Sequence, residues 1–279
     1  MGREVSKQTP CAPGETKLAT ATAEPLRTIF ITGAASGIGR ATARWFAQRG
    51  WRVGCFDINA RGLDVFRTEL GDTNAFFHTL DVADRPAVLA AVEAFGAWSD
   101  GRLDLLFSNA GIEALGPFGE MAWDKVRALV EVNLLGGMSV IHAALPLLRA
   151  TPGALCLSTA SGSATFGTAN LAVYSATKHG VKGLTEALAV ELASDGVRAA
   201  DLLPGIIDTG MLPDDIKDRI PTDGVWRLLP AEAVAEAAWS AYHGDKLHWY
   251  VPAELADYDV EVTTHPEKAR DDLMAGRLL

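Results

Sequence analysis

The chain has 279 residues, of which 48% are hydrophobic, and carries a formal net charge of -10 at pH 7. This size and composition predict one large α/β domain with a sizeable core, and the acidity argues against nucleic acid or an anionic membrane as the main partner. We see no apolar run of the ~18 to 20 residues needed to span a bilayer. The three cysteines, Cys11, Cys55 and Cys156, are few and widely spaced, which favours a reducing, cytoplasmic location.

The order of sequence patterns predicts the fold class. Residues 1–25 lack the apolar segment of a secretory signal, and we expect a flexible tail there. Short apolar segments then predict seven strands, at 27–32, 52–57, 74–80, 103–108, 154–159, 197–203 and 247–251. Segments with helical periodicity separate them, at 37–49, 60–70, 84–98, 121–149, 172–194 and 230–243. The alternation predicts a single domain over 26–255, a Rossmann-type doubly wound parallel sheet with helices on both faces, followed by a C-terminal extension at 256–279.

A glycine-rich turn joins the first strand to the first helix, with the sequence Thr32-Gly33-Ala34-Ala35-Ser36-Gly37-Ile38-Gly39. Glycines allow a tight turn and close approach of a pyrophosphate, and the helix N-terminus offers unpaired N–H groups. The alternative is a glycine turn with no ligand. Its position at the first strand-to-helix turn of a doubly wound pattern favours a dinucleotide site.

Asp57 ends the second strand, twenty residues beyond Gly37. A carboxylate there can accept hydrogen bonds from the ribose hydroxyls of NAD, and it would repel the 2′-phosphate of NADP. The nearest cations are Arg40 and Arg61. We therefore predict NAD(H) rather than NADP(H), the alternative for Asp57 being a turn residue or helix cap.

Tyr174 and Lys178 are four residues apart, a spacing that places both on one face of a helix. A lysine charge close to a tyrosine favours the phenolate and lowers the tyrosine pKa from its usual ~10. A tyrosine tuned in this way can exchange a proton with an alcohol or carbonyl oxygen. Taken alone, the pair is better explained by a helix-edge tyrosine and a solvated lysine.

Together these motifs resemble the short-chain dehydrogenase/reductase family over residues 26–252. The resemblance rests on the glycine turn, Asp81-Val82, Asn109-Ala110-Gly111, Asn133, Ser161, the Tyr174/Lys178 pair and Pro204-Gly205-Ile206-Ile207-Asp208-Thr209, in the family's order and spacing. It implies catalytic roles for Asn133, Ser161, Tyr174 and Lys178. It implies that the cofactor is bound by Gly33, Ser36, Gly37, Ile38, Gly39, Asp57, Ile58, Asp81, Val82, Asn109, Ala110, Gly111, Tyr174, Lys178, Pro204, Gly205, Ile207 and Thr209, and no metal site is expected.

The resemblance also implies how these residues act. Tyr174 would be the general base in alcohol oxidation or the general acid in ketone reduction. Lys178 would lower the pKa of Tyr174 and hydrogen-bond the nicotinamide ribose. Ser161 would hold the substrate oxygen, and Asn133 would hold a water that links Lys178 to solvent.

Two departures from the family pattern stand out. Ser108 occupies a position where the family usually has asparagine, and Ser158 and Ser163 flank Ser161, so the choice of Ser161 depends on its spacing to Tyr174. After Trp249 the chain lacks the family's DGG-like ending, which packs at a subunit interface. We therefore expect a homodimer or a homotetramer, with the dimer at least as plausible.

The segment at 205–229 is expected to form a substrate lid, because it follows the sixth strand and interleaves apolar with acidic residues. Leu115, Phe118 and Phe166 could line the same pocket. An apolar pocket would suit a hydrophobic secondary alcohol or ketone, such as a terpenoid, steroid-like or aromatic compound. The alternative is that the apolar residues only pack the lid onto the body of the domain.

The sequence thus predicts an NAD(H)-dependent oxidoreductase that interconverts a secondary alcohol and a ketone by hydride transfer. A non-catalytic dinucleotide-binding sensor or scaffold is one alternative. A dehydratase or epimerase on the same fold is another.

Overall fold

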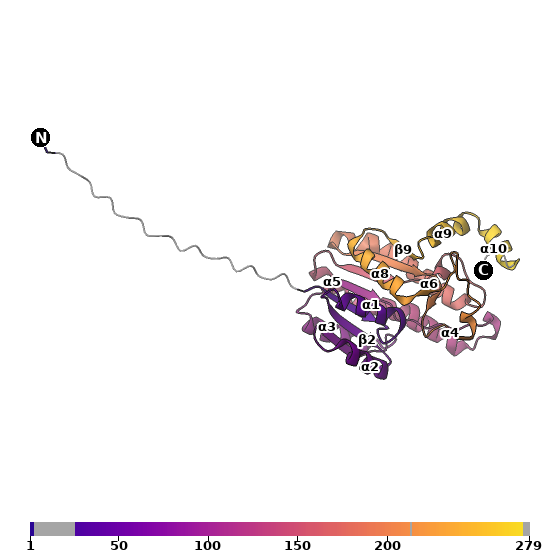
Figure 1. Cartoon of the computed structure of the whole chain (residues 1–279), viewed down its shortest axis with the longest axis horizontal. Coiled ribbons are helices and arrows are strands. Elements are labelled where there is room, and N and C mark those ends of the chain that lie inside the picture. The colour runs from indigo at the N-terminus through magenta and orange to yellow at the C-terminus, as the bar shows by residue number, and fades with distance from the viewer. Residues whose placement is uncertain (3–25, 213, 276–279) are drawn as a thin grey trace.

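The computed structural model describes residues 1–2, 26–212 and 214–275. The expected N-terminal tail therefore lies almost entirely outside the described residues. Figure 1 shows the body of the molecule as strands enclosed by helices, with the helices of the C-terminal segment projecting at one end.

Seven strands form one parallel sheet, which confirms the predicted fold class. They are β1 (Thr28–Thr32), β2 (Arg52–Asp57), β3 (Ala75–Thr79), β4 (Leu105–Ser108), β5 (Leu155–Thr159), β6 (Arg198–Pro204) and β9 (His248–Val251). Their order is β3-β2-β1-β4-β5-β6-β9. The chain therefore reverses its direction of growth between β1 and β4, and in open α/β sheets ligands bind at such a switch point, outside the carboxyl ends of the strands.

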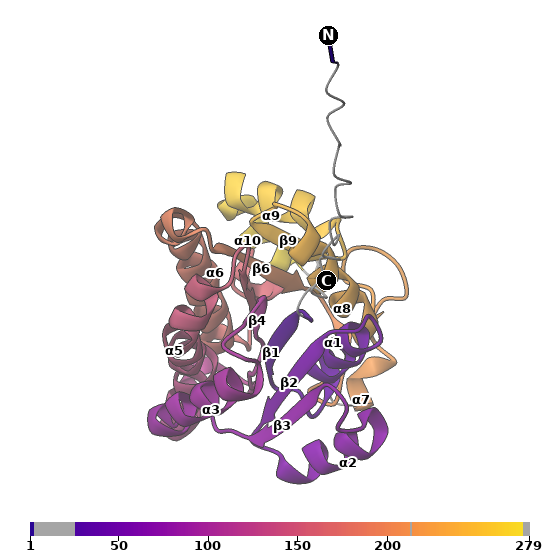
Figure 2. The same ribbon diagram turned by 90° about the vertical axis from the view of Figure 1, so that its left-hand side faces the viewer.

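Helices cover both faces of this sheet. On one face lie α1 (Gly37–Ala47), α2 (Ala60–Leu70) and α8 (Ala231–His243), and on the other lie α3 (Arg85–Trp98), α5 (Gly137–Ala150) and α6 (Ala172–Glu191), as Figure 2 shows. Right-handed crossovers between parallel strands produce this two-sided arrangement. Both faces of the sheet are consequently buried, which explains the nearly continuous apolar strands.

The alternation of side chains along each strand divides the core into two layers. Ile29 and Ile31 of β1 face α1 and α8, whereas Phe30 between them faces α3 and α5. The ring of Phe30 stacks on Phe56 of β2 with centroids 3.7 Å apart. Successive strand residues point to opposite faces, so a strand sandwiched between helix layers needs apolar residues at every position.

One long helical segment differs from a regular α-helix. The segment predicted at 121–149 comprises α4 (Trp123–Val130), a π-helical turn η2 (Glu131–Gly136) and α5. Contrary to the sequence expectation, this stretch, Trp123–Ala150, is long and apolar enough to cross a membrane by length and composition, within the part of the chain that the structure describes. A single such helix is weak evidence, and the buried side chains of α5 pack against the sheet and α3.

Beyond the sixth strand the chain forms the lid region and a C-terminal helix pair. A two-stranded ribbon of β7 (Ile207–Asp208) and β8 (Leu229–Pro230) closes the base of the lid, which contains the short helix α7 (Asp214–Lys217). The C-terminal extension folds into α9 (Leu255–Thr264), which packs beside β9, and α10 (Pro266–Met274), which packs against α9. Asp259 anchors α9, because its carboxylate accepts hydrogen bonds from Lys182 of α6 at 2.7 Å and from the Tyr250 hydroxyl at 2.5 Å.

Candidate active site

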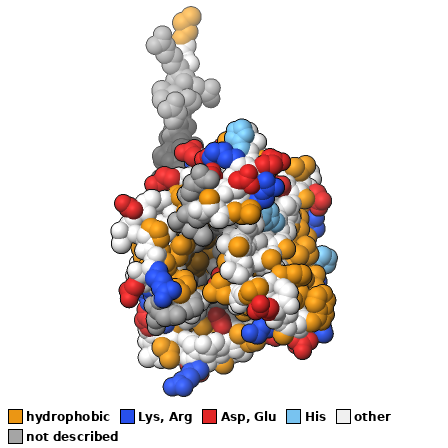
Figure 3. Space-filling model, turned by 90° about the vertical axis from the view of Figure 1, so that its right-hand side faces the viewer, with side chains coloured by type: hydrophobic (Ala, Val, Ile, Leu, Met, Phe, Trp, Pro, Cys, Tyr) orange, Lys and Arg blue, Asp and Glu red, His pale blue; other side chains and the backbone are white. Residues whose placement is uncertain are grey.

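A cavity of about 560 Å³ lies at the carboxyl ends of the strands and extends under the lid. This volume falls in the range of small-molecule and cofactor sites. Its wall combines the glycine turn, the ends of β2 to β6, the start of α6, the lid and the C-terminal helices. Figure 3 shows a face of the molecule that is hollowed, with hydrophobic side chains gathered around the hollow.

The glycine turn at the start of α1 leaves no room for a side chain at Gly39 and favours glycine at Gly33. A Cβ atom at Gly39 would lie 2.1 Å from the Gly33 carbonyl oxygen, and Gly33 itself has a φ of +72°. Asn109 braces the turn from β4, since its side-chain amide donates to the Thr32 carbonyl at 3.0 Å. At these glycines the backbone at the N-terminus of α1 is close-packed and not covered by side chains. This arrangement fits the pyrophosphate of a dinucleotide.

Asp57 lies at one end of the cavity and is half-buried. Its Oδ2 accepts a hydrogen bond from the Ala35 backbone N–H at 2.9 Å, and its Oδ1 accepts one from the Asn59 N–H at 2.8 Å. These bonds tie the end of β2 to the glycine turn and fix the direction of the carboxylate. The carboxylate of Asp57 therefore stabilises the glycine turn and also lines the cavity, where it can contact a ligand.

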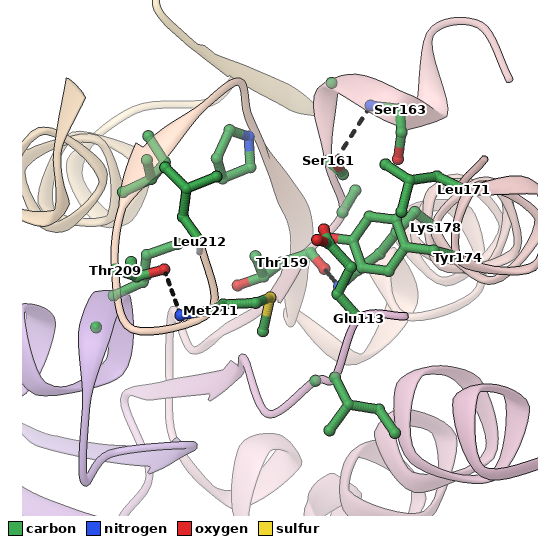
Figure 4. Close-up of a pocket in the computed structure, with 18 of the residues that line it drawn as sticks. Glu113, Thr159, Ser161, Ser163, Leu171, Tyr174, Lys178, Thr209, Met211 and Leu212 are labelled. Carbon is green, nitrogen blue, oxygen red and sulfur yellow. Dashed lines mark hydrogen bonds between the residues drawn. The ribbon is translucent and has the colours of Figure 1, made fainter. Parts of the chain in front are cut away.

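Tyr174 enters the cavity from the first turn of α6, and Ser161 enters from the loop after β5 (Figure 4). The phenol is open to the cavity on one side and enclosed on the others. This enclosure raises the pKa of Tyr174 to about 12, a hydrogen bond with Ser161 acts in the opposite direction, and the charge of Glu113 adds to the rise. The hydroxyls of Ser161 and Tyr174 consequently form a pair that one ligand oxygen can contact.

Lys178 lies one helical turn beyond Tyr174 and is only 4% exposed. Its Nζ is 5.5 Å from the Tyr174 ring centroid and donates a hydrogen bond to the Thr159 carbonyl at 2.8 Å. Burial lowers the pKa of Lys178 to about 8, partly offset by the charge of Glu113. The expected lowering of the Tyr174 pKa is therefore not found in this structure, because burial of the phenol outweighs the other influences on it.

Asn133 lies outside the main cavity, in the π-helical turn η2. Its Oδ1 accepts from the Ile112 N–H at 2.8 Å, and its Nδ2 donates to the Ile112 carbonyl at 2.9 Å. A second cavity of about 10 Å³ lies between Asn133 and Lys178, bordered also by Ser158 and Thr159. This space is close to the smallest that holds a single water, and it has polar walls. Such π-turns are frequent at functional sites.

Most of the residues expected at the cofactor site line the large cavity; Gly39 packs behind the turn instead. Of the expected pocket residues, Leu115 and Phe166 line it, whereas Phe118 does not and is 62% exposed. The lid contributes apolar side chains as anticipated. They are those of Met211, Leu212, Ile216, Ile220 and Trp226.

Several lining residues had no motif to mark them. Glu113 follows the Asn109-Ala110-Gly111 turn, and its position after the carboxyl end of β4 was a usable signal. The Ser163 hydroxyl is buried and has no hydrogen-bond partner within the part of the chain that the structure describes. Tyr258 and Leu273 reach the cavity from α9 and α10, and the Tyr258 ring meets Trp226 of the lid edge-on at 5.2 Å. The C-terminal extension thus completes the cavity wall.

Comparison with known proteins agrees with this geometry. A family model described as short chain dehydrogenase matches residues 27–219. The chain is 32% identical to a D-threitol dehydrogenase of Mycolicibacterium smegmatis, covering 75% of this chain and 83% of the relative. It is 37% identical to a cis-4-hydroxycyclohexanecarboxylate dehydrogenase of Sinomonas cyclohexanicum, covering 76% and 87%. A solved structure of the 3-ketoacyl-(acyl-carrier-protein) reductase from Brucella melitensis complexed with NADH is similar with a TM-score of 0.73 and 31% identity, covering 81% of this chain and 96% of that one.

Proposed function

The chain belongs to the short-chain dehydrogenase family, and on that basis we propose that it is an NAD(H)-dependent oxidoreductase that interconverts a secondary alcohol and a ketone. The observation that carries the proposal is one continuous cavity, with the bare glycine turn and Asp57 at one end and Ser161, Tyr174 and Lys178 at the other. The bound nicotinamide dinucleotide supplies or accepts the hydride. The protein supplies the proton transfer and the positioning.

The proton steps follow from the geometry. Ser161 and Tyr174 hold the substrate oxygen between their hydroxyls. Because the pKa of Tyr174 is raised to about 12, the phenol carries its proton at neutral pH and can give it to the oxygen of a ketone as reduction proceeds. In alcohol oxidation the phenol must first lose that proton, and Lys178, with a pKa of about 8, lies close enough to favour the phenolate while it is charged.

The small cavity beside Lys178 supports the proposed role of Asn133. A water there would contact Lys178 on one side and the polar atoms around Asn133 on the other. We assign to this water the exchange of protons between Lys178 and solvent. The side chain of Asn133 keeps the π-turn next to the cofactor-lining loop through its two hydrogen bonds to Ile112.

The preference for NAD(H) rests on Asp57. The proposed cofactor-binding set is the one predicted from the sequence. Four of its members that line the cavity would contact the adenosine, and they are Asp57, Ile58, Asp81 and Val82. Arg40, one of the two nearest cations in the sequence, is ion-paired with Glu69. Because Arg40 already pairs with Glu69, its charge is not free to bind a 2′-phosphate. The carboxylate of Asp57 lines the cavity, where it would accept hydrogen bonds from ribose hydroxyls and repel a 2′-phosphate.

The proposal also covers the substrate class, the cellular location and the oligomeric state. The apolar lid suits a substrate with a hydrophobic body, as predicted for a terpenoid, steroid-like or aromatic compound. We propose a cytoplasmic homodimer or homotetramer, supported by large hydrophobic side chains exposed on α4, η2 and α6, which are Trp123, Leu135 and Val190. Light scattering on the purified protein measures this assembly.

Replacement of Tyr174 by Phe tests the proposed function. Formation of NADH from NAD is followed with a panel of secondary alcohols, and the variant should lose about 10²- to 10⁴-fold in kcat/KM, the usual contribution of a positioned acid or base. NADH binding, measured by fluorescence titration, should persist. Tyr242→Phe is the matched control, since Tyr242 lies on α8 outside the cavity. Turnover by Tyr174→Phe at the wild-type rate would refute the mechanism, and NADH binding without turnover of any alcohol by the wild type would favour a sensor or scaffold.

A further inference from the structure

Glu113 is a charged residue in the part of the cavity where the chemistry is proposed to occur. It follows the turn after β4, and its side chain extends into the same space as that of Tyr174 (Figure 4). The side chains around it and across the cavity are largely apolar, among them Leu115, Leu171 and Met211. The presence of a carboxylate among apolar side chains needs a functional explanation, because an unpaired charge is costly to bury.

Among residues 26–212 and 214–275, the carboxylate of Glu113 accepts no hydrogen bond and forms no ion pair. Two polar groups of the same cavity, those of Ser161 and Lys178, do have partners. Ser161 Oγ accepts from the Ser163 N–H at 3.1 Å, and Lys178 Nζ donates to the Thr159 carbonyl. Burial raises the pKa of Glu113, and the charge of Lys178 acts against that rise. The carboxylate of Glu113 is therefore available to accept a hydrogen bond from a ligand.

The position of this acceptor relative to the reacting oxygen is constrained. Glu113 lines the same cavity as Tyr174 and Lys178, and Figure 4 draws its side chain next to that of Tyr174. The charge of Glu113 accordingly acts on both residues. A ligand group bonded to Glu113 must consequently lie close to the carbon whose oxygen contacts Ser161 and Tyr174. The far end of a long substrate, under the lid, meets apolar side chains instead.

We propose that Glu113 determines substrate specificity by accepting a hydrogen bond from a second hydroxyl, on the carbon next to the reacting one. The cavity then selects vicinal diols in oxidation and α-hydroxy ketones in reduction, with the rest of the molecule apolar. This inference rests on the proposed oxidoreductase function and refines its substrate class. A substrate with a carboxylate at that carbon would be repelled by Glu113.

Matched substrate pairs test the proposal. The pairs are cyclohexanol with cis- and trans-1,2-cyclohexanediol, and 2-butanol with 2,3-butanediol, each oxidised with NAD. Within a pair the ring or chain and the reacting group are the same, so the ratio of kcat/KM for diol over mono-alcohol isolates the second hydroxyl. A hydrogen bond to a charged acceptor predicts a ratio of about 10 to 100 for the wild type.

The variants are Glu113→Leu and Glu113→Gln, with Glu120→Gln, an exposed residue outside the cavity, as the control. Glu113→Leu should lower the ratio about tenfold or more, Glu113→Gln should lower it less because the amide oxygen still accepts a bond, and the control should keep the wild-type ratio. If Glu113 only tunes Tyr174 and Lys178 electrostatically, both members of each pair change together and the ratio stays constant, which would overturn the inference while leaving the proposed function intact. Absence of NADH formation from every alcohol in the wild type would overturn both.

Discussion

Asp57→Asn is the sharpest test of the cofactor preference. The substitution removes the negative charge and keeps one of the two acceptor oxygens, so it retains one of the hydrogen bonds that Asp57 accepts from the Ala35 and Asn59 N–H groups at 2.9 and 2.8 Å. A carboxylate about 4 Å from one phosphate charge is repelled by about 1 kcal/mol in water and by about 4 kcal/mol at an effective dielectric constant near 20. Since Asp57 is half-buried, we expect the lower half of this range.

The expected result is a rise of about 5- to 70-fold in the ratio of kcat/KM with NADP to that with NAD. The assay uses one alcohol and both cofactors, and NADH and NADPH titrations give the binding component separately. An unchanged ratio would refute the assigned role of Asp57.

Asp57→Ala serves as a comparison, because it removes both hydrogen bonds as well as the charge. It should cost about 2 kcal/mol of stability and lower Tm by about 4 to 8 °C, whereas Asp57→Asn, which keeps one of the two hydrogen bonds, should lower Tm by less. A change in cofactor preference that appeared only in Asp57→Ala would point to loosening of the glycine turn rather than to charge.

Two further predictions concern stability. Ser163→Ala removes a buried hydroxyl that has no partner among the described residues, so the free energy of unfolding of the ligand-free protein should rise by about 1 kcal/mol. A lower value in chemical denaturation would show that the hydroxyl is satisfied. The pKa of His248 is raised above its ordinary 6.5, mainly by its hydrogen bond to the buried Asp201 at 2.8 Å. The folded state therefore binds that proton more tightly than the unfolded state, so this contribution is fully present below pH 6.5 and is lost as the pH rises through the raised value. His248→Gln should flatten the fall in stability above pH 6.5, and an equally steep fall in the variant would exclude this pair as its cause.

Much of the fold was predictable because it depends on local pattern. Continuous apolar strands alternating with helical segments leave a parallel sheet covered on both faces as the solution that buries them. The glycine turn was recognisable for the same reason, since the absence of side chains at Gly33 and Gly39 is a property of the sequence itself. The spacing of Tyr174 and Lys178 needed only the geometry of one helix.

Features that depend on packing between distant segments were not predictable. The π-turn at Asn133 arises inside a sequence with ordinary helical periodicity. Phe118 lies one short turn beyond Leu115, and only the path of the loop decides that Leu115 lines the cavity and Phe118 does not. No sequence pattern in 255–275 predicts that Tyr258 and Leu273 reach the cavity. Their positions depend on the hydrogen bonds by which Asp259 fixes α9 to Lys182 and Tyr250.

The sequence by itself determined the sheet, the dinucleotide turn and the identity of the residues proposed to move the proton, because each is encoded in a short stretch of chain. Only the tertiary structure decided their electrostatic environment. Burial raises the pKa of Tyr174, where helix spacing alone predicted a decrease. The tertiary fold also brings Glu113 close enough for its charge to act on both Tyr174 and Lys178. A pKa depends on every group and void around an atom, and those surroundings come from segments far apart in the chain.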